Sequence, residues 1–272
     1  MGRPAIAVLA IWLICATAVG GQARADAVIW TPTVAPEGFD TPDAEWITLE
    51  GAMGRHFLAA VLRPEGTGSF PVVVVLHGAR GLLPRDLALG QEVAEAGFIV
   101  IVGCWHFAEG NDVCSAATPQ ADWVADPAAH AGRELVAAAR LLPGASGDRV
   151  GLYGLSRGGH AALWAASTGA DVQAVVVDSP AYVPPGVDPR PANPLDVVAG
   201  LDATVLTLHG TGDDEVPVDL ARTYERAALE LGKPLTAVYF EGIGHRTTVQ
   251  AGSQDEARRR AIAFFREQLL GT

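Results

Sequence analysis

The sequence has little basic charge and almost no lysine. Lys233 is the only lysine, and the 19 basic residues face 31 acidic ones, giving a formal net charge of −12 at pH 7. This excess of negative charge disfavours nucleic acids and anionic membrane surfaces as partners, because both repel an acidic protein. The shortage of lysine relative to arginine is a compositional bias and carries no functional signal.

Long apolar runs are lacking after the amino-terminal segment, so no membrane span is expected in the rest of the chain. The uncharged run from Pro4 to Val19 follows Arg3, and an Ala-x-Ala motif ends at Ala25. This pattern predicts a secretory signal peptide over residues 1–25, and therefore export to the periplasm or the extracellular space. A membrane anchor is the alternative, but the run is shorter than the ~20 residues needed to span a bilayer.

Cysteine is also scarce, with three residues in the chain. Cys15 lies in the expected signal segment, where a lipid-modified cysteine is the alternative, but the bulky Ile14 precedes it. Cys104 and Cys114 lie in one expected loop of a protein bound for an oxidising compartment, which favours a disulfide between them. A metal site at these two cysteines would lack its other ligands.

No internal repeat and no domain linker is found. Cleavage after residue 25 would leave 247 residues, 17 of them basic and 31 acidic, with a formal charge of −14. This length suits one domain with a full hydrophobic core. We expect an extended lead-in over residues 26–45 and a single folded domain over residues 46–272.

Short apolar runs alternate with amphipathic stretches from about residue 70 onward. This alternation predicts an α/β fold with a mostly parallel, doubly wound sheet. An antiparallel hairpin is expected ahead of it, over residues 46–50 and 55–62. Further strands are expected over residues 72–76, 98–102, 149–153, 172–177, 204–208 and 235–240, and helices over residues 86–96, 130–142, 157–167, 218–231 and 254–270.

Two connections are longer than a compact α/β link requires. They span residues 105–129 and 180–200, and the second carries six prolines and no helical periodicity. Long ordered loops often form binding sites, so Trp105, Phe107 and Tyr182 are candidates for lining a pocket. Core packing is the alternative for the tryptophan, and a stiff surface loop without substrate contact is the alternative for the second connection.

A glycine-rich motif surrounds Ser156. Gly154, Gly158 and Gly159 flank the serine, an expected strand over residues 149–153 precedes it, and an apolar helix follows. This is the context of a nucleophile elbow, in which small residues allow a sharp turn that exposes the serine hydroxyl. A glycine-rich helix start without catalytic meaning is the alternative.

A second motif follows the expected strand over residues 72–76. His77, Gly78 and Ala79 come directly after that strand, where a loop contributes one backbone N–H to an oxyanion hole. The other N–H comes from the residue after the nucleophile. We therefore expect the main-chain groups of Ala79 and Arg157 to be the donors, and His77 to be a structural residue.

An acidic motif follows the expected strand over residues 204–208. His209 begins it, and Asp213 lies four residues further on. A carboxylate at the end of a strand near the elbow can accept a hydrogen bond from a catalytic imidazole and fix its tautomer. Asp213 is the preferred residue, with Asp214 and Asp178 as alternatives.

His245 is the preferred general base among the seven histidines. It follows Gly244 on a loop between the last expected strand and the carboxy-terminal helix. It also lies downstream of both Ser156 and Asp213, and serine, then acid, then histidine is the order found in α/β-hydrolases.

From about residue 46 to residue 272, the chain resembles the dienelactone hydrolase and prolyl-oligopeptidase-like branch of the α/β-hydrolase superfamily. The resemblance implies a single-domain α/β-hydrolase fold. It departs from dienelactone hydrolases proper, which use a cysteine nucleophile, and the propeller of large prolyl oligopeptidases has no counterpart here. The motifs that carry it are His77-Gly78, Gly154 to Gly159, His209 to Pro217 and Gly244-His245.

The motifs together predict a serine hydrolase that cleaves small-molecule carboxylic esters through an acyl-enzyme, with no metal and no organic cofactor. A peptidase, a lactone or carbon–carbon bond hydrolase, and an inactive binding module are the alternatives. Arg80 or Arg85 is a candidate for binding a substrate carboxylate, with a solvated surface position as the alternative. The sequence gives no indication of oligomeric state.

Overall fold

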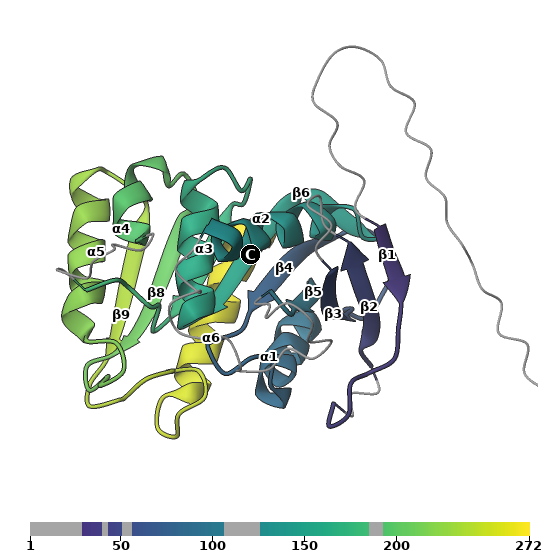
Figure 1. Ribbon diagram of the computed structural model, residues 1–272, viewed down its shortest axis with the longest axis horizontal. Coiled ribbons are helices and arrows are strands. Elements are labelled where there is room, and N and C mark those ends of the chain that lie inside the picture. The colour runs from purple at the N-terminus through teal and green to yellow at the C-terminus, as the bar shows by residue number, and fades with distance from the viewer. Residues whose placement is uncertain (1–28, 40–42, 51–55, 106–125, 185–192) are drawn as a thin grey trace, which may run out of the picture.

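The computed structural model describes residues 29–39, 43–50, 56–105, 126–184 and 193–272. Within them the strands form one sheet in the order β1-β2-β3-β5-β4-β6-β7-β8-β9 (Figure 1). The strands are β1 (Ile29–Pro32), β2 (Glu45–Glu50), β3 (His56–Leu62), β4 (Phe70–Leu76), β5 (Ile99–Gly103), β6 (Ala145–Leu155), β7 (Ala174–Asp178), β8 (Thr204–Gly210) and β9 (Leu235–Phe240).

The sheet has an antiparallel and a parallel part. Strands β1, β2 and β3 pair antiparallel, and β3 also pairs antiparallel with β5. From β5 through β4 and β6 to β9 every pairing is parallel. The predicted α/β fold, with a mostly parallel sheet and an amino-terminal antiparallel hairpin, is confirmed.

Helices cover both faces of the sheet (Figure 1). The side chains of α2, α3 and α5 pack into the core on one face, and those of α1, α6 and η3 pack on the other. The helices are α1 (Pro84–Glu95), α2 (Asp126–Arg140), α3 (Arg157–Ser167), α4 (Pro194–Val197), α5 (Val218–Glu230) and α6 (Gln254–Phe265), with a 3₁₀ turn η2 (Val198–Gly200) and a π-helical turn η3 (Arg266–Leu270).

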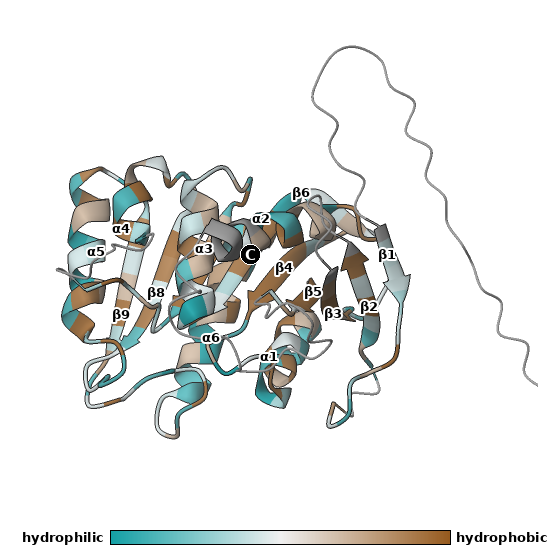
Figure 2. Cartoon of the chain, viewed as in Figure 1, coloured by the Kyte–Doolittle hydropathy of each residue, from teal (hydrophilic) through white to brown (hydrophobic). Residues whose placement is uncertain are grey.

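Strand β4 shows why a continuous apolar run is needed at the centre of this sheet. Val72, Val74 and Leu76 belong to the core on one face, whereas Val73 and Val75 belong to the core on the other. Successive side chains of a strand point to opposite faces, so a strand covered on both sides must be apolar at every position. The hydropathy colouring of Figure 2 shows the same apolar character along the central strands.

Two elements differ from the sequence-based expectation. Residues 29–32 of the expected lead-in form β1, which pairs with β2. The connection over residues 180–200 contains the helix α4. This helix is a single turn, which is too short for a helical periodicity to appear in the sequence. The cue was local instead: the Asn193 side chain accepts a hydrogen bond from the Leu195 N–H (3.3 Å), and Pro194 occupies the first turn.

Several sequence-based predictions fall outside the described residues. The expected signal segment over residues 1–25, Phe107 and Cys114 are among them. Cys104 is buried just after β5, and its pairing with Cys114 stays a prediction. None of the helices in the described ranges combines the length and the apolar character needed to cross a membrane.

Close packing of α2 on the sheet yields a stability prediction. Leu135 is 1% exposed, and a Cβ atom added to Gly103 would lie 2.9 Å from its Cδ1 atom. Leu135→Ala should lower the free energy of unfolding by about 2–5 kcal/mol, because it leaves a cavity in a close-packed core. Urea denaturation measures this change.

The matched control is Leu229→Ala in α5, where the same side chain is 53% exposed. It should alter the free energy of unfolding by no more than about 0.5 kcal/mol. Equal losses in the two variants would contradict the assigned packing of α2 against the sheet.

Candidate active site

Ser156 lies in a sharp turn between β6 and α3. Its backbone has φ 54° and ψ −112°, a conformation that non-glycine residues rarely adopt and that costs about 1–3 kcal/mol. The Ser156 N–H donates to the carbonyl oxygen of Asp178 (2.9 Å), and its own carbonyl accepts from the His160 N–H (3.0 Å). These bonds hold the serine at the carboxyl end of the sheet.

The flanking glycines are required by close backbone contacts. A Cβ atom on Gly154 would lie 2.3 Å from the carbonyl oxygen of Gly158, and one on Gly158 would lie 2.0 Å from that of Leu76. Neither contact leaves room for a side chain. The motif around Ser156 is therefore a tight turn between a strand and a helix, and its role as a nucleophile elbow stays a prediction.

The predicted oxyanion donors, Ala79 and Arg157, belong to two different segments near Ser156. Ala79 lines the same pocket as Ser156, on the loop after β4. The two loops pack closely, since a Cβ atom on Gly78 would lie 3.5 Å from the Ser156 Cβ. Arg157 is the first residue of α3, so its N–H has no acceptor within the helix, and the helix dipole favours negative charge there.

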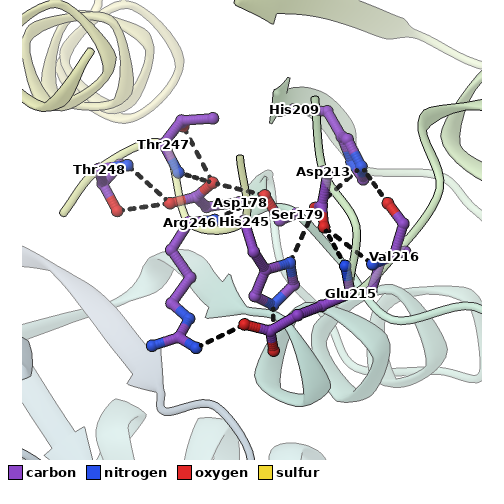
Figure 3. Close-up of polar contacts among 10 residues, drawn as sticks. All are labelled: Asp178, Ser179, His209, Asp213, Glu215, Val216, His245, Arg246, Thr247 and Thr248. Carbon is purple, nitrogen blue, oxygen red and sulfur yellow. Dashed lines mark hydrogen bonds and ion pairs between the residues drawn. The ribbon is translucent and has the colours of Figure 1, made fainter. Parts of the chain in front are cut away.

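Asp213 lies in the turn after β8 and is hydrogen-bonded through both carboxylate oxygens. Its Oδ1 accepts from the N–H groups of Glu215 (3.0 Å) and Val216 (2.8 Å). Its Oδ2 lies 2.8 Å from His245 Nδ1 and 3.3 Å from His209 Nε2. Figure 3 shows the carboxylate between the two imidazoles.

The environment of Asp213 keeps it ionised. Burial by itself would raise the pKa of this carboxyl, but hydrogen bonds from His209, His245 and the Val216 N–H outweigh it and hold the pKa well below its ordinary value. Since an ionised carboxylate can only accept, the Nδ1 atom of His245 carries a proton and its Nε2 atom is left as the basic one.

Ser156 and His245 line one pocket in the structure. The His245 side chain is 4% exposed, so its imidazole is largely shielded from water. Within the described residues no hydrogen bond joins the Ser156 hydroxyl to the His245 Nε2 atom; such bonds are often long before substrate binds. The structure thus brings the two side chains to one cavity and joins His245 directly to Asp213.

The alternative acids lie elsewhere. Asp214 is exposed on the same turn. Asp178 is fully buried at the end of β7, and its carboxylate accepts from Thr247 and Thr248 instead of from His245. Of the three candidates, Asp213 is the one placed on the imidazole.

Two of the candidate lining residues pack in the core. Trp105 is buried, and its Nε1–H donates to the carbonyl oxygen of His77 (2.9 Å). Tyr182 is buried with its ring centre 5.4 Å from that of Tyr224. Neither contributes to the wall that the described residues give the pocket. Trp105 instead contacts the loop after β4, through the carbonyl oxygen of His77.

Two pocket residues were not expected from the sequence. Arg246 and Glu215 both line the pocket, and their side chains pair at 3.0 Å. The Glu215 Oε2 atom lies 3.9 Å from the Nε2 atom of His245 (Figure 3). Glu215 follows the candidate acid Asp214 in the sequence, and Arg246 follows His245. This adjacency is the one sequence feature that could have indicated their place in the pocket.

The pocket wall is rich in arginine. Arg80, Arg85 and Arg246 line it together with the single carboxylate of Glu215. The Arg85 Nε atom is buried and has no hydrogen-bond partner among the described residues. Burial lowers the pKa of Arg85 from its ordinary value, Asp86 opposes this, and the charges of Arg246 and Arg80 lower it further. The pocket therefore offers excess positive charge to a small ligand.

Comparison with known proteins identifies one matching family. Residues 57–269 match the model of a family described as the dienelactone hydrolase family. A Bradyrhizobium protein named "Probable 2-oxo-3-(5-oxofuran-2-ylidene)propanoate lactonase" is 27% identical over 210 residues, which cover 76% of this chain and 84% of that protein.

Solved structures share the fold. A dienelactone hydrolase-like promiscuous phosphotriesterase from metagenomic libraries aligns over 83% of this chain and 98% of its own, with a TM-score of 0.71 and 19% identity. A Porphyromonas gingivalis dipeptidyl peptidase 4 aligns over 83% of this chain but 35% of its own, with a TM-score of 0.70 and 17% identity. At these identities the likeness shows the fold alone.

The depressed pKa of Asp213 predicts how stability depends on pH. A carboxyl whose folded pKa is lowered stabilises the fold above its unfolded pKa of about 3.9, and this contribution is lost as the pH falls through the folded pKa. The loss of unfolding free energy in Asp213→Asn should therefore be largest near pH 7 and shrink below about pH 4. Chemical denaturation at a series of pH values measures this difference.

Asp214→Asn is the control, because it removes the neighbouring carboxylate at an exposed position. Its stability should follow that of the wild type at each pH. A constant difference between wild type and Asp213→Asn from pH 7 to pH 3 would contradict the ionised, hydrogen-bonded state assigned to Asp213.

Proposed function

The chain belongs to the dienelactone hydrolase family, and from this we propose that it is a serine hydrolase that cleaves small carboxylic esters and lactones. The observation that carries the proposal is the shared pocket of Ser156 and His245, with His245 bound to Asp213 at 2.8 Å. A strained serine, a shielded imidazole and a buried carboxylate are the parts that activate a serine nucleophile.

In the first half of the reaction, the Nε2 atom of His245 removes the proton from the Ser156 hydroxyl. The serine oxygen attacks the carbonyl carbon of the ester, and the carbonyl oxygen becomes negatively charged. The N–H groups of Ala79 and Arg157 donate to this oxyanion. Removing one such donor typically costs about 2.7–4 kcal/mol of transition-state stabilisation.

The second half releases the product. The imidazolium of His245 protonates the departing alkoxide as the tetrahedral intermediate collapses to an acyl-enzyme. In a lactone this alcohol remains attached to the acyl group, so the ring opens without losing a fragment. His245 then removes a proton from a water molecule, whose oxygen attacks the acyl carbon. The bond to the Ser156 oxygen breaks, the imidazolium returns the proton to that oxygen, and the acid is released.

The substrate is proposed to be small and to carry a carboxylate. Three arginines and one glutamate line the pocket, and a guanidinium such as that of Arg85 can donate charge-assisted hydrogen bonds to an anionic group. The name of the Bradyrhizobium relative supports the same choice, since a propanoate lactone combines a cleavable ring with a carboxylate.

Export is part of the same proposal. The apolar run with its Ala-x-Ala motif over residues 1–25 supports it, and a disulfide between Cys104 and Cys114 would follow from it in an oxidising compartment.

Loss of the nucleophile tests the proposed chemistry. Ser156→Ala should reduce kcat for p-nitrophenyl acetate by at least about 1,000-fold, because the acyl-enzyme can no longer form. A fluorophosphonate probe should label wild-type protein at Ser156, as located by peptide mass spectrometry.

Ser146→Ala is the matched control, since this serine lies near the other end of the same strand β6. It should retain wild-type turnover and labelling. Full activity in Ser156→Ala, or labelling at a different residue, would refute the assignment of the nucleophile.

Arg85 provides a test of the substrate class. Arg85→Gln should raise KM about tenfold for the mono-p-nitrophenyl ester of succinate, which carries a free carboxylate, because a charge-assisted hydrogen bond is lost. KM for the neutral p-nitrophenyl acetate should stay within about twofold of the wild type. Arg226→Gln, on the exposed face of α5, should change neither value. Equal effects of Arg85→Gln on both esters would remove the support for an anionic substrate.

A further inference from the structure

Asp178 occupies a central place in the fold. It is the last residue of β7, which lies between β6 and β8, the strands that lead to Ser156 and Asp213. The register sets Asp178 directly opposite Leu155 on one side and Leu208 on the other. Its side chain is 0% exposed. A fully buried carboxylate is costly unless donors satisfy it, so its contacts show its role.

The Asp178 carboxylate is satisfied by the loop that carries the histidine. Its Oδ1 accepts from the Thr247 N–H (2.8 Å) and the Thr247 hydroxyl (2.9 Å). Its Oδ2 accepts from the Thr248 N–H (2.8 Å) and the Thr248 hydroxyl (2.5 Å). Both threonines follow His245 closely in the chain, and Figure 3 shows them on one side of the carboxylate.

The backbone around Asp178 holds the nucleophile and the histidine loop as well. The carbonyl oxygen of Asp178 accepts from the Ser156 N–H (2.9 Å). The next residue, Ser179, accepts the Arg246 N–H on its hydroxyl (3.0 Å), and its own N–H donates to the Leu208 carbonyl (2.8 Å). Two consecutive residues thus contact the nucleophile turn, the loop of the base and the strand that precedes the acid.

The loop of the base needs such an attachment. It connects β9 to α6 without a regular helix or strand, and Arg246 adopts φ 73°, which is unfavourable for a residue with a side chain. The position of His245 is therefore set by side-chain and turn contacts instead of by a repeating backbone pattern. Four donors of this loop, two from Thr247 and two from Thr248, end on the Asp178 carboxylate at the end of the strand next to β6. Longer contacts from the hydroxyls of Ser179 (3.3 Å) and Tyr153 (3.5 Å) complete its surroundings.

We propose that Asp178 is a positioning residue, which holds His245 at the correct place relative to Ser156 by fixing Thr247 and Thr248. The inference rests on the proposed serine-hydrolase function, and it assigns Asp178 no contact with substrate. A purely structural role would lower stability alone. A positioning role also lowers kcat in the folded enzyme, because misplacing a catalytic group by about 1 Å can cost 100-fold in rate.

Asp178→Asn and Thr247→Val test this role on the full chain with p-nitrophenyl acetate. Asparagine has nearly the same shape as aspartate, but its NH₂ group cannot accept hydrogen bonds from the N–H and hydroxyl groups of Thr247 or Thr248. The loop should therefore shift, and kcat should fall about 100-fold with KM within about twofold of the wild type. Thr247→Val removes one hydroxyl at nearly constant volume and should lower kcat about tenfold. Thr247→Ser restores the hydroxyl and should restore kcat to within about twofold.

Gln173→Ala is the matched control at the other end of β7. The Gln173 side chain accepts from the Val150 N–H (2.8 Å), so its loss should lower the melting temperature while kcat stays at the wild-type value. All rates are measured well below each melting temperature, with folding checked by circular dichroism.

Wild-type kcat in folded Asp178→Asn or folded Thr247→Val would overturn the inference, even if both variants melt earlier. If Asp178→Asn does not fold, the comparison of kcat between Thr247→Val and Thr247→Ser tests the inference alone, and wild-type kcat in folded Thr247→Val would overturn it. Failure of the proposed function is seen separately, as full turnover in Ser156→Ala.

Discussion

The register of three neighbouring parallel strands is the constraint on which the site depends. Leu155, Asp178 and Leu208 lie in one row across β6, β7 and β8. Because parallel strands all end at the same edge, the turns that follow them bring distant parts of the chain together. Helices on both faces cover the sheet, so this row of residues lies between two apolar cores.

Two buried carboxylates, those of Asp213 and Asp178, have different roles at the carboxyl edge of the sheet in the proposed mechanism. Asp213 acts on the imidazole itself and keeps the Nε2 atom of His245 basic. Asp178 acts on the backbone and hydroxyl groups beyond His245 and so governs where the imidazole lies. Each is surrounded by N–H and hydroxyl donors, which compensate for the loss of water around a charged group. In the proposed mechanism, electrostatic activation and geometric control therefore reside in different residues.

Charge in the pocket is unevenly distributed. Glu215 pairs with Arg246 and lies 3.9 Å from the Nε2 atom of His245, so the one carboxylate among the lining residues lies beside the imidazole. Arg80 follows Ala79 on the loop after β4, and Arg85 lies in the first turn of α1; both line the pocket. An anionic substrate of the proposed kind would bind with its charge towards these two arginines and away from Glu215, because like charges repel in a partly shielded pocket.

The sequence by itself determined the alternation of strands and helices, the glycines around Ser156 and the order of Ser156, Asp213 and His245, because apolar periodicity, turn chemistry and chain order are local properties. The sequence favoured Asp213 but left Asp214 and Asp178 open, and the tertiary structure decided that Asp213 contacts the imidazole. Asp178 ends β7, and the loop that packs against it brings Thr247 and Thr248 to its carboxylate instead. The tertiary structure also placed Trp105 in the core and Glu215 in the pocket, since side chains find their partners through strand register and loop packing, which no stretch of sequence contains.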